Sequence, residues 1–283
     1  METVPKTAVG ILSPGKMGAG IGEVIRSAGH EVFWCSQGRS AVTADRAERT
    51  GLVGTPDLDA LASTVEVIFS ICPPENAENV AAEVAATGFT GLFVEANAIS
   101  STRFDTIADR LETAGAKVLD ACIMGKPPNA SAKTRLYLNG DAEWIGLAAG
   151  LFAEGTVEIF TIPEPRGRAS ALKIAHSTFV KLDRVIAALA HSLARSYDVG
   201  EILAEEAQHD GRFALAEPDH LPSVASRAWR WLSEMDDAAD LMTRVGISEK
   251  MVLAAKEIME IWSVDKDKDD LATDVVLDQL RQS

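Results

Sequence analysis

Lys173, His176 and Ser177 are spaced so that one face of a helix would carry an amine, an imidazole and a hydroxyl. They lie in the segment GRASALKIAHS at residues 167–177, where a long run of helical periodicity begins. A lysine flanked by apolar residues can be partly withdrawn from water, and such an amine can act as a general acid or base. The alternative is that Lys173 is a solvated surface residue and His176 a packing residue.

A glycine-rich turn near the start of the chain predicts a dinucleotide site. Residues 7–34 have the pattern of a buried strand, a turn with Gly15 and Gly18, a helix and a second strand. The amides that open such a helix can face a pyrophosphate. The turn departs from G-x-G-x-x-G, since Ser13 replaces the first glycine, and a tight turn without a ligand is the alternative. The predicted cofactor contacts here are Ser13, Pro14, Gly15, Lys16 and Met17.

The segment after the second strand favours NADP over NAD. A fold that prefers NAD places an acidic residue there, where it binds the ribose 2′-hydroxyl. This chain instead has Ser36, Arg39 and Ser40, and an arginine accompanied by hydroxyls suits a 2′-phosphate. The alternative is a solvated Arg39 and a helix cap at Ser40.

Two later strands are each followed by candidate ligand contacts. Residues 65–72 form an apolar run typical of a strand that is buried on both faces, and the loop after it would cross the cofactor. Its predicted contacts are Ile71, Cys72 and Pro73. Asn97 follows the next predicted strand, at residues 91–95, either as a ligand contact or as a turn residue that satisfies its own backbone.

A polar loop at residues 122–140 follows a predicted strand at 117–121. Gly125 and Lys126 would bring an open backbone and a cation to the carboxyl end of that strand, which suits a substrate carboxylate or phosphate. A surface crossover with a solvated lysine is the alternative.

These residues require an α/β fold, with a doubly wound sheet followed by helices. Strand and helix signals alternate as far as residue 162, which predicts a Rossmann domain over residues 1–163. Strand signals end at Pro163-Glu164-Pro165, so residues 164–283 are predicted to form an all-helical domain. The predicted helices there span 169–197, 201–208, 220–245 and 248–261, with an exposed tail from residue 264.

Composition limits the function classes. The 283 residues suit two domains, and a net charge of -15 argues against a broad surface for nucleic acid or an anionic membrane. The three cysteines are far apart and lack metal-ligand spacing, so we expect reduced thiols, no metal and a cytoplasmic protein. We expect no signal peptide and no membrane span, since no apolar run approaches the roughly 18 residues that a span needs.

Five motifs together resemble the β-hydroxyacid dehydrogenases, which include 3-hydroxyisobutyrate dehydrogenase and 6-phosphogluconate dehydrogenase. They are VGILSPGKMG, IFSICPP, VEANAIS, LDACIMGKPP and GRASALKIAHS. The resemblance implies an NAD(P)-dependent dehydrogenase or reductase that acts on CH–OH groups, with Lys173 as the catalytic acid or base. It also implies substrate contacts at Met124, Gly125 and Lys126, and a homodimer formed through the helical domains.

The chain departs from the family pattern at the substrate site. The fourth motif usually has a serine and two glycines where this chain has Met124, Gly125 and Lys126, and the asparagine four residues after the lysine is replaced by Ser177. Ser177 keeps a donor with shorter reach, so substrate placement must differ. The variant that is most similar is an NADP-linked subgroup that also has an AWRW-like helix, here at residues 228–231.

We therefore predict an NADP-dependent oxidoreductase that moves a hydride between the nicotinamide and the alcohol or carbonyl carbon of a small polar substrate, such as a hydroxy acid. Asn97, Gly125 and Ser177 would position that substrate. One alternative is an imine reductase, although those enzymes commonly have aspartate or tyrosine in place of Lys173. A second is a non-catalytic NADPH-binding redox sensor, and decarboxylation after oxidation ranks below both. Trp229, Arg230 and Met235 either complete a partner's site or pack within their own helices.

Overall fold

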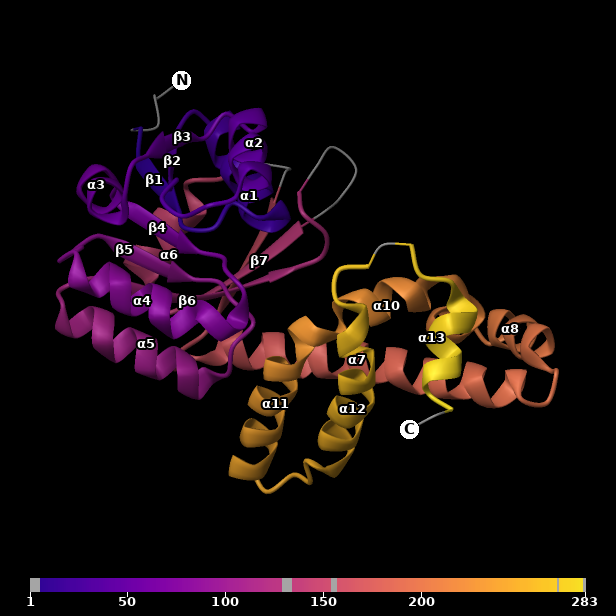
Figure 1. Cartoon of the computed structure of the whole chain (residues 1–283). Coiled ribbons are helices and arrows are strands. Elements are labelled where there is room, and N and C mark those ends of the chain that lie inside the picture. The colour runs from indigo at the N-terminus through magenta and orange to yellow at the C-terminus, as the bar shows by residue number, and fades with distance from the viewer. Residues whose placement is uncertain (1–5, 129–133, 154–156, 269, 282–283) are drawn as a thin grey trace. The chain divides into compact units, whose positions relative to one another are not determined.

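The computed structural model describes residues 6–128, 134–153, 157–268 and 270–281. It divides the chain into two compact units, Met1–Lys173 and Ile174–Ser283. The division falls inside a long helix, further along the chain than the boundary expected at Pro163. Figure 1 shows the sheet of the first unit and the helices of the second.

The first unit is built around an eight-stranded sheet with the order β3-β2-β1-β4-β5-β6-β7-β8. Its strands are β1 (Ala8–Ile11), β2 (Glu31–Cys35), β3 (Val53–Thr55), β4 (Val67–Ser70), β5 (Leu92–Glu95), β6 (Lys117–Met124), β7 (Thr134–Asn139) and β8 (Val157–Ile162). Neighbouring strands run parallel, apart from the antiparallel pair β6 and β7. The order reverses between β1 and β4, and such a switch point is where open α/β sheets bind ligands. The predicted Rossmann class is confirmed.

Helices cover both faces of this sheet, as Figure 1 shows. They are α1 (Lys16–Ser27), α2 (Ala41–Arg49), α3 (Leu58–Thr64), α4 (Ala77–Ala86), α5 (Ser101–Thr113) and α6 (Ala142–Ala149). One core contains Phe69 and residues of α1, α2 and α6, and the other contains Ile68 and residues of α3, α4 and α5. Consecutive residues of β4 thus point to opposite cores, which explains why this strand is apolar throughout.

The second unit is helical and has its own core. Its helices are α7 (Arg168–Arg195), which begins in the first unit, α8 (Gly200–His209), α9 (Phe213–Ala216), α10 (Leu221–Ala228), α11 (Leu232–Arg244), α12 (Lys250–Ile261) and α13 (Thr273–Gln279). Trp262 is fully buried and packs with Met235, Met259 and Val276. The helical class predicted for this part of the chain is confirmed.

The structure corrects three predicted elements. β6 continues beyond residue 121 to Met124, because residues 120–124 pair with β7. The helix predicted over 220–245 is interrupted by a 3-10 turn at Trp229–Trp231, which separates α10 from α11. The tail is not simply exposed, since Val276 of α13 is buried in the core.

The 3-10 turn gives the two indole rings different neighbours. Trp231 lies under the Lys181 amine and the Arg184 guanidinium of α7, at 5.6 and 5.5 Å from the ring centroid. Trp229 lies under Lys266, at 3.8 Å. The two indole rings of this short turn thus contact basic side chains from different segments of the chain.

Candidate active site

The predicted ligand contacts of the first unit lie at one edge of its sheet. β1, β4, β5 and β6 run parallel, so their carboxyl ends meet at the same edge. The segments that follow them contain the glycine-rich loop, the Ile71–Pro73 loop, Asn97 and the Gly125–Lys126 turn. Segments that are far apart in the sequence are therefore brought together where this fold class binds its ligands.

The glycine-rich loop leaves the start of α1 open. α1 begins after Gly15, which has no side chain to cap the helix, whereas Ser40, Asp57, Ser100 and Asp141 cap α2, α3, α5 and α6. A Cβ atom added at Gly15 would meet nothing within 4 Å. Uncapped amides beside open space fit the pyrophosphate of a dinucleotide, because the helix dipole favours an anion there.

Two further glycines of α1 allow close packing around this loop. A Cβ atom on Gly18 would lie 2.5 Å from the Ser13 carbonyl oxygen. A Cβ atom on Gly20 would lie 3.0 Å from Cδ of Pro128, in the segment after β6. α1 therefore touches its own loop through Gly18 and the predicted substrate loop through Gly20.

Two arginines hold the backbone of the glycine-rich loop. Arg39 donates from Nη2 to the Leu12 carbonyl at 3.3 Å, and Arg46 of α2 donates from Nη1 to the Pro14 carbonyl at 3.2 Å. Ser36 donates to the Thr55 carbonyl, and Ser40 caps α2 by accepting from the Thr43 amide. Arg46 was missed in the sequence because it lies inside a helix, away from the loop motif.

Asn97 joins the ends of β4 and β5. Its Oδ1 accepts from the Cys72 amide at 2.7 Å, and its Nδ2 donates to Ser70 Oγ at 2.9 Å. The Asn97 amide donates to Glu95 Oε1, and Asn97 is only 3% exposed. The side chain thus fixes the start of the loop that was predicted to cross the cofactor.

Glu95 is a buried carboxyl beside this asparagine. It is 0% exposed, and burial raises its pKa to about 8, opposed by hydrogen bonds from Asn97 and Ser70. Burial also raises the pKa of the Cys72 thiol to about 12. At neutral pH, Glu95 is therefore mostly protonated and Cys72 is a thiol rather than a thiolate.

Lys173 is held against β6. Its Nζ donates to the carbonyl oxygen of Ile123 at 2.7 Å, and the side chain is partly buried. Ile123 is near the carboxyl end of β6, so the amine lies at the edge of the sheet that carries the glycine-rich loop. Lys173 is partly buried, His176 is exposed and Ser177 is buried. The three side chains predicted to share one helix face therefore differ in their access to water.

Ser177 belongs to the second unit and is engaged there. It is 8% exposed and donates to Glu234 Oε2 at 3.1 Å, and Lys181 forms an ion pair with the same carboxylate oxygen. Met235 is fully buried in the core of its own unit, which supports packing within its own helices, the second of the two alternatives. Arg230 is paired with Asp267, and with Trp229 it makes contacts of ordinary helix packing.

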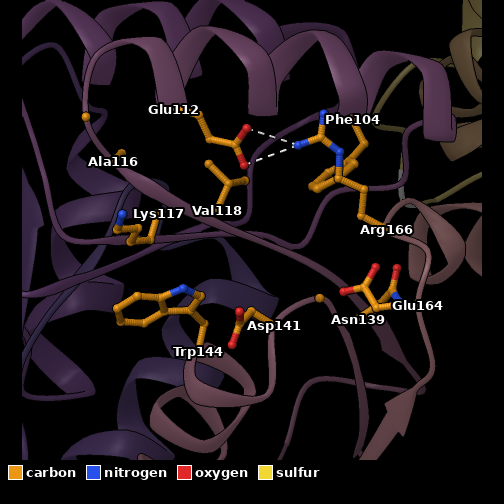
Figure 2. A pocket seen from close by; sticks show the side chains of 12 residues that line it. Phe104, Glu112, Ala116, Lys117, Val118, Asn139, Asp141, Trp144, Glu164 and Arg166 are labelled. Atoms are coloured by element: carbon orange, nitrogen blue, oxygen red, sulfur yellow. Dashed lines mark hydrogen bonds and ion pairs between the residues drawn. The ribbon is translucent and has the colours of Figure 1, made fainter.

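A separate groove of about 470 Å³ opens at the other edge of the sheet. Figure 2 shows the side chains that line it. It lies between Lys117 at the start of β6 and Asn139 at the end of the antiparallel β7. Arg166 in this groove is paired with Glu112 and Asp109. The groove therefore lies away from the edge that carries Lys173.

Neither a metal centre nor a membrane span is found in the described ranges. Within them, no group of three or more His, Cys, Asp or Glu side chains could hold a metal ion. No helix of the same ranges is long and apolar enough to cross a bilayer.

A family model for the NAD-binding domain of 6-phosphogluconate dehydrogenase matches residues 8–162, which is more than half of the chain. The chain belongs to the β-hydroxyacid dehydrogenase family. This NAD(P)-dependent oxidoreductase also matches a domain of unknown function, DUF1932, over residues 194–262. None of the curated proteins compared with the chain matches it significantly.

Several solved structures share the fold. Mycobacterium tuberculosis 3-hydroxyisobutyrate dehydrogenase, solved with L-serine, is 20% identical with a TM-score of 0.77, and the match covers 98% of this chain and 100% of that one. Psf3, solved with NADP+ and 2-OPP, is 19% identical with a TM-score of 0.71, covering 96% and 99%. A Bacillus cereus imine reductase is 15% identical with a TM-score of 0.57, covering 98% and 99%.

Proposed function

We propose that this family member is an NADP-dependent oxidoreductase that interconverts the alcohol and carbonyl forms of a small polar hydroxy acid. The observation that carries the proposal is the position of Lys173. Its amine lies 2.7 Å from the Ile123 carbonyl, at the sheet edge where α1 starts uncapped after Gly15. The proposed proton-transfer group and the proposed dinucleotide cradle would thus share one edge of the sheet, where this fold class binds ligands.

Lys173 moves the proton. The bound nicotinamide supplies or accepts the hydride. In the oxidation direction the neutral amine accepts the proton of the substrate hydroxyl, and in reduction the ammonium group donates it to the carbonyl oxygen. The Ile123 carbonyl accepts one N–H of the amine and so orients the remaining positions toward the substrate.

The turn after β6 is proposed to bind the substrate anion. Gly125 and Lys126 are exposed, and Gly125 adopts a φ of 105°, a conformation that glycine reaches without strain. Thr134 donates from Oγ1 to the Lys126 carbonyl at 2.7 Å, which fixes the backbone of the turn. Met124, the last residue of β6, is buried beneath this turn. Asn97 would act indirectly, by holding the loop that follows β4.

NADP is the proposed cofactor. Arg39 is exposed beside the glycine-rich loop, close to the end of β2, where a ribose 2′-phosphate would lie. The crystallised Psf3, which has the same fold, was solved with NADP+. Contacts of the nucleotide with Ser13, Pro14, Lys16, Met17, Ile71 and Pro73 belong to the same proposal.

Replacement of Lys173 by alanine tests the catalytic assignment. The probes are 3-hydroxyisobutyrate and L-serine with NADP+, because a relative of the same fold is a 3-hydroxyisobutyrate dehydrogenase solved with L-serine. We expect kcat to fall about 10²- to 10⁴-fold, since a general acid or base has been removed. The Kd of NADPH, measured by fluorescence titration, should change less than threefold. Lys117→Ala, at the exposed opposite end of β6, is the matched control and should retain full turnover.

The same assay separates the alternatives. Turnover of a ketone only when an amine is added, or of a cyclic imine alone, would identify an imine reductase. Tight NADPH binding without a change in its absorbance across alcohols, ketones and imines would identify a non-catalytic sensor. Loss of NADPH binding and turnover together in Lys173→Ala would contradict the proposed role of the lysine.

A homodimer through the helical unit is also proposed. Phe179, Ile186 and Leu193 of α7 are spaced by seven residues and are 72%, 52% and 64% exposed. A heptad spacing of large apolar side chains is the pattern of a helix seam, and water contact with it is unfavourable. We further propose a cytoplasmic location, which the free thiols of Cys35, Cys72 and Cys122 support.

A further inference from the structure

Four buried polar residues form a row across the sheet of the first unit. Ser70 is in register with Glu95, Glu95 with Asp120, and Asp120 with Asn139, on four adjacent strands. All four residues are 0% exposed. Burying a polar row costs free energy unless each group is hydrogen-bonded, so the partners of the row indicate what it does.

Asp120 and Asn139 bind the first amides of α7. Asn139 Oδ1 accepts from the Arg168 amide at 2.9 Å, and Asp120 Oδ2 accepts from the Ala169 amide at 2.8 Å. Asp120 also accepts from the Ser170 amide at 3.1 Å and from the Ser170 hydroxyl at 2.7 Å. The first amides of a helix have no partner within the helix, and a carboxylate there also complements the helix dipole. The sheet therefore supplies the cap of α7.

β6, which carries Asp120, also holds the far end of the first turn of α7. Ser170 and Lys173 are three residues apart on α7, and their partners Asp120 and Ile123 are three residues apart on β6. Ala169, whose amide also donates to Asp120, is buried against Cys122 and Met124. β6 thus fixes the first turn of α7 at two points, of which Asp120 is one and the Lys173 amine is the other.

We propose that Asp120 is a positioning residue for Lys173, holding the first turn of α7 so that the amine stays against the Ile123 carbonyl. Burial raises the pKa of Asp120 to about 6, opposed by the Ser170 and Ala169 donors, so the carboxylate form dominates at neutral pH. The inference rests on the proposed function only in that Lys173 is the proton-transfer group. The contacts themselves lie wholly within the first unit.

The first test measures the Lys173 amine without any substrate. Acetylation of the folded protein by an N-hydroxysuccinimide ester at pH 8 is followed for each lysine by mass spectrometry. In Asp120→Asn, we expect Lys173 to react at least fivefold faster than in the wild type, because the side-chain amide cannot accept all the N–H donors of the turn. Lys117 should react at an unchanged rate. Asp141→Asn removes a carboxylate cap from α6 instead and should leave Lys173 unchanged. A Lys173 rate within twofold of the wild type in folded Asp120→Asn would overturn the proposal.

Ser170→Ala keeps the test decisive if Asp120→Asn does not fold. It removes the 2.7 Å hydroxyl bond to Asp120 and leaves the carboxylate and the amides in place. Lys173 should then react about twofold faster, and an unchanged rate in this variant would contradict the inference.

A double-mutant cycle tests whether Asp120 acts through Lys173. Asp120→Asn should lower kcat at least tenfold, with the Kd of NADPH changed less than threefold, and it should cause no further loss in a Lys173→Ala background. An equal loss in both backgrounds would show that Asp120 acts independently of Lys173. Full activity of Lys173→Ala alone would instead refute the proposed function, while the acetylation result would still judge the positioning contact.

Discussion

Arg39 contacts the glycine-rich loop and is the residue on which the choice of NADP over NAD is predicted to depend. In Arg39→Glu, the KM for NADPH should rise about 10- to 100-fold, because the proposed charge-assisted hydrogen bond with the 2′-phosphate, worth about 1.5–3 kcal/mol, would be lost. The KM for NADH should rise much less, since NADH has no 2′-phosphate and would be affected only through the lost bond from Arg39 to the Leu12 carbonyl. Steady-state kinetics with both nucleotides measure the difference.

Arg49→Glu is the matched control for this experiment. Arg49 is exposed in the last turn of α2 and undergoes the same change of charge. It should leave both KM values close to those of the wild type. Equal increases for NADPH and NADH in Arg39→Glu would remove the argument from the 2′-phosphate.

Single residues could be predicted from the sequence where the signal is local. Lys173 and the glycine-rich loop stand out through short motifs, and the structure places both at the ligand-binding edge. Glu95 and Asp120 lie inside motifs that were singled out, yet their pairing was not predicted. Strand register brings them together, and register depends on contacts between distant segments that one sequence does not display.

At the level of elements, Gly15, which precedes α1, and Gly18, in the first turn of α1, have opposite surroundings. Gly15→Ala places a methyl group in open space at a φ of -65°, so the melting temperature of the protein without nucleotide should change by less than about 2 °C. The Kd of NADPH should nevertheless rise at least tenfold, because the methyl group would occupy the space proposed for the pyrophosphate.

Gly18→Ala should show the reverse order of effects. Its methyl group would lie 2.5 Å from the Ser13 carbonyl, so α1 must shift and the melting temperature should fall by several degrees before any nucleotide is added. Calorimetry and fluorescence titration distinguish the two variants. A Gly15→Ala protein that binds NADPH normally would show that the nucleotide does not use this loop.

Elements could be predicted where periodicity is long or apolar runs are unbroken. Most strands and helices of the first unit and the long α7 follow from such patterns, whereas the short β3 and α3 were not predicted. The break at Trp229–Trp231 contains neither glycine nor proline, and its indole rings contact Lys181, Arg184 and Lys266, which are distant in the sequence. α13 is short, and the charged residues before it conceal the apolar pair that it buries.

At the level of the whole molecule, the apolar seam of α7 predicts a change of oligomeric state. Ile186→Asp should convert the proposed homodimer to a monomer, because a buried unpaired carboxylate costs more than one residue of a seam contributes. Size-exclusion chromatography with light scattering measures the mass. Val264→Asp, at a site 69% exposed outside α7, is the control and should remain dimeric. A wild-type chain that is monomeric at micromolar concentration would refute the homodimer.

Gly20 lies directly against Pro128, so the helix that follows the nucleotide loop touches the segment that follows β6. Engineering of the substrate range would begin with residues 125–128, yet the path of their backbone is limited by its contact with α1 at Gly20, which has no side chain. A larger side chain at position 20 would displace this segment, and a displaced segment would in turn shift α1 and the proposed nucleotide site. Directed evolution toward new substrates should therefore select changes at positions 20 and 128 jointly, with coenzyme affinity screened in every round.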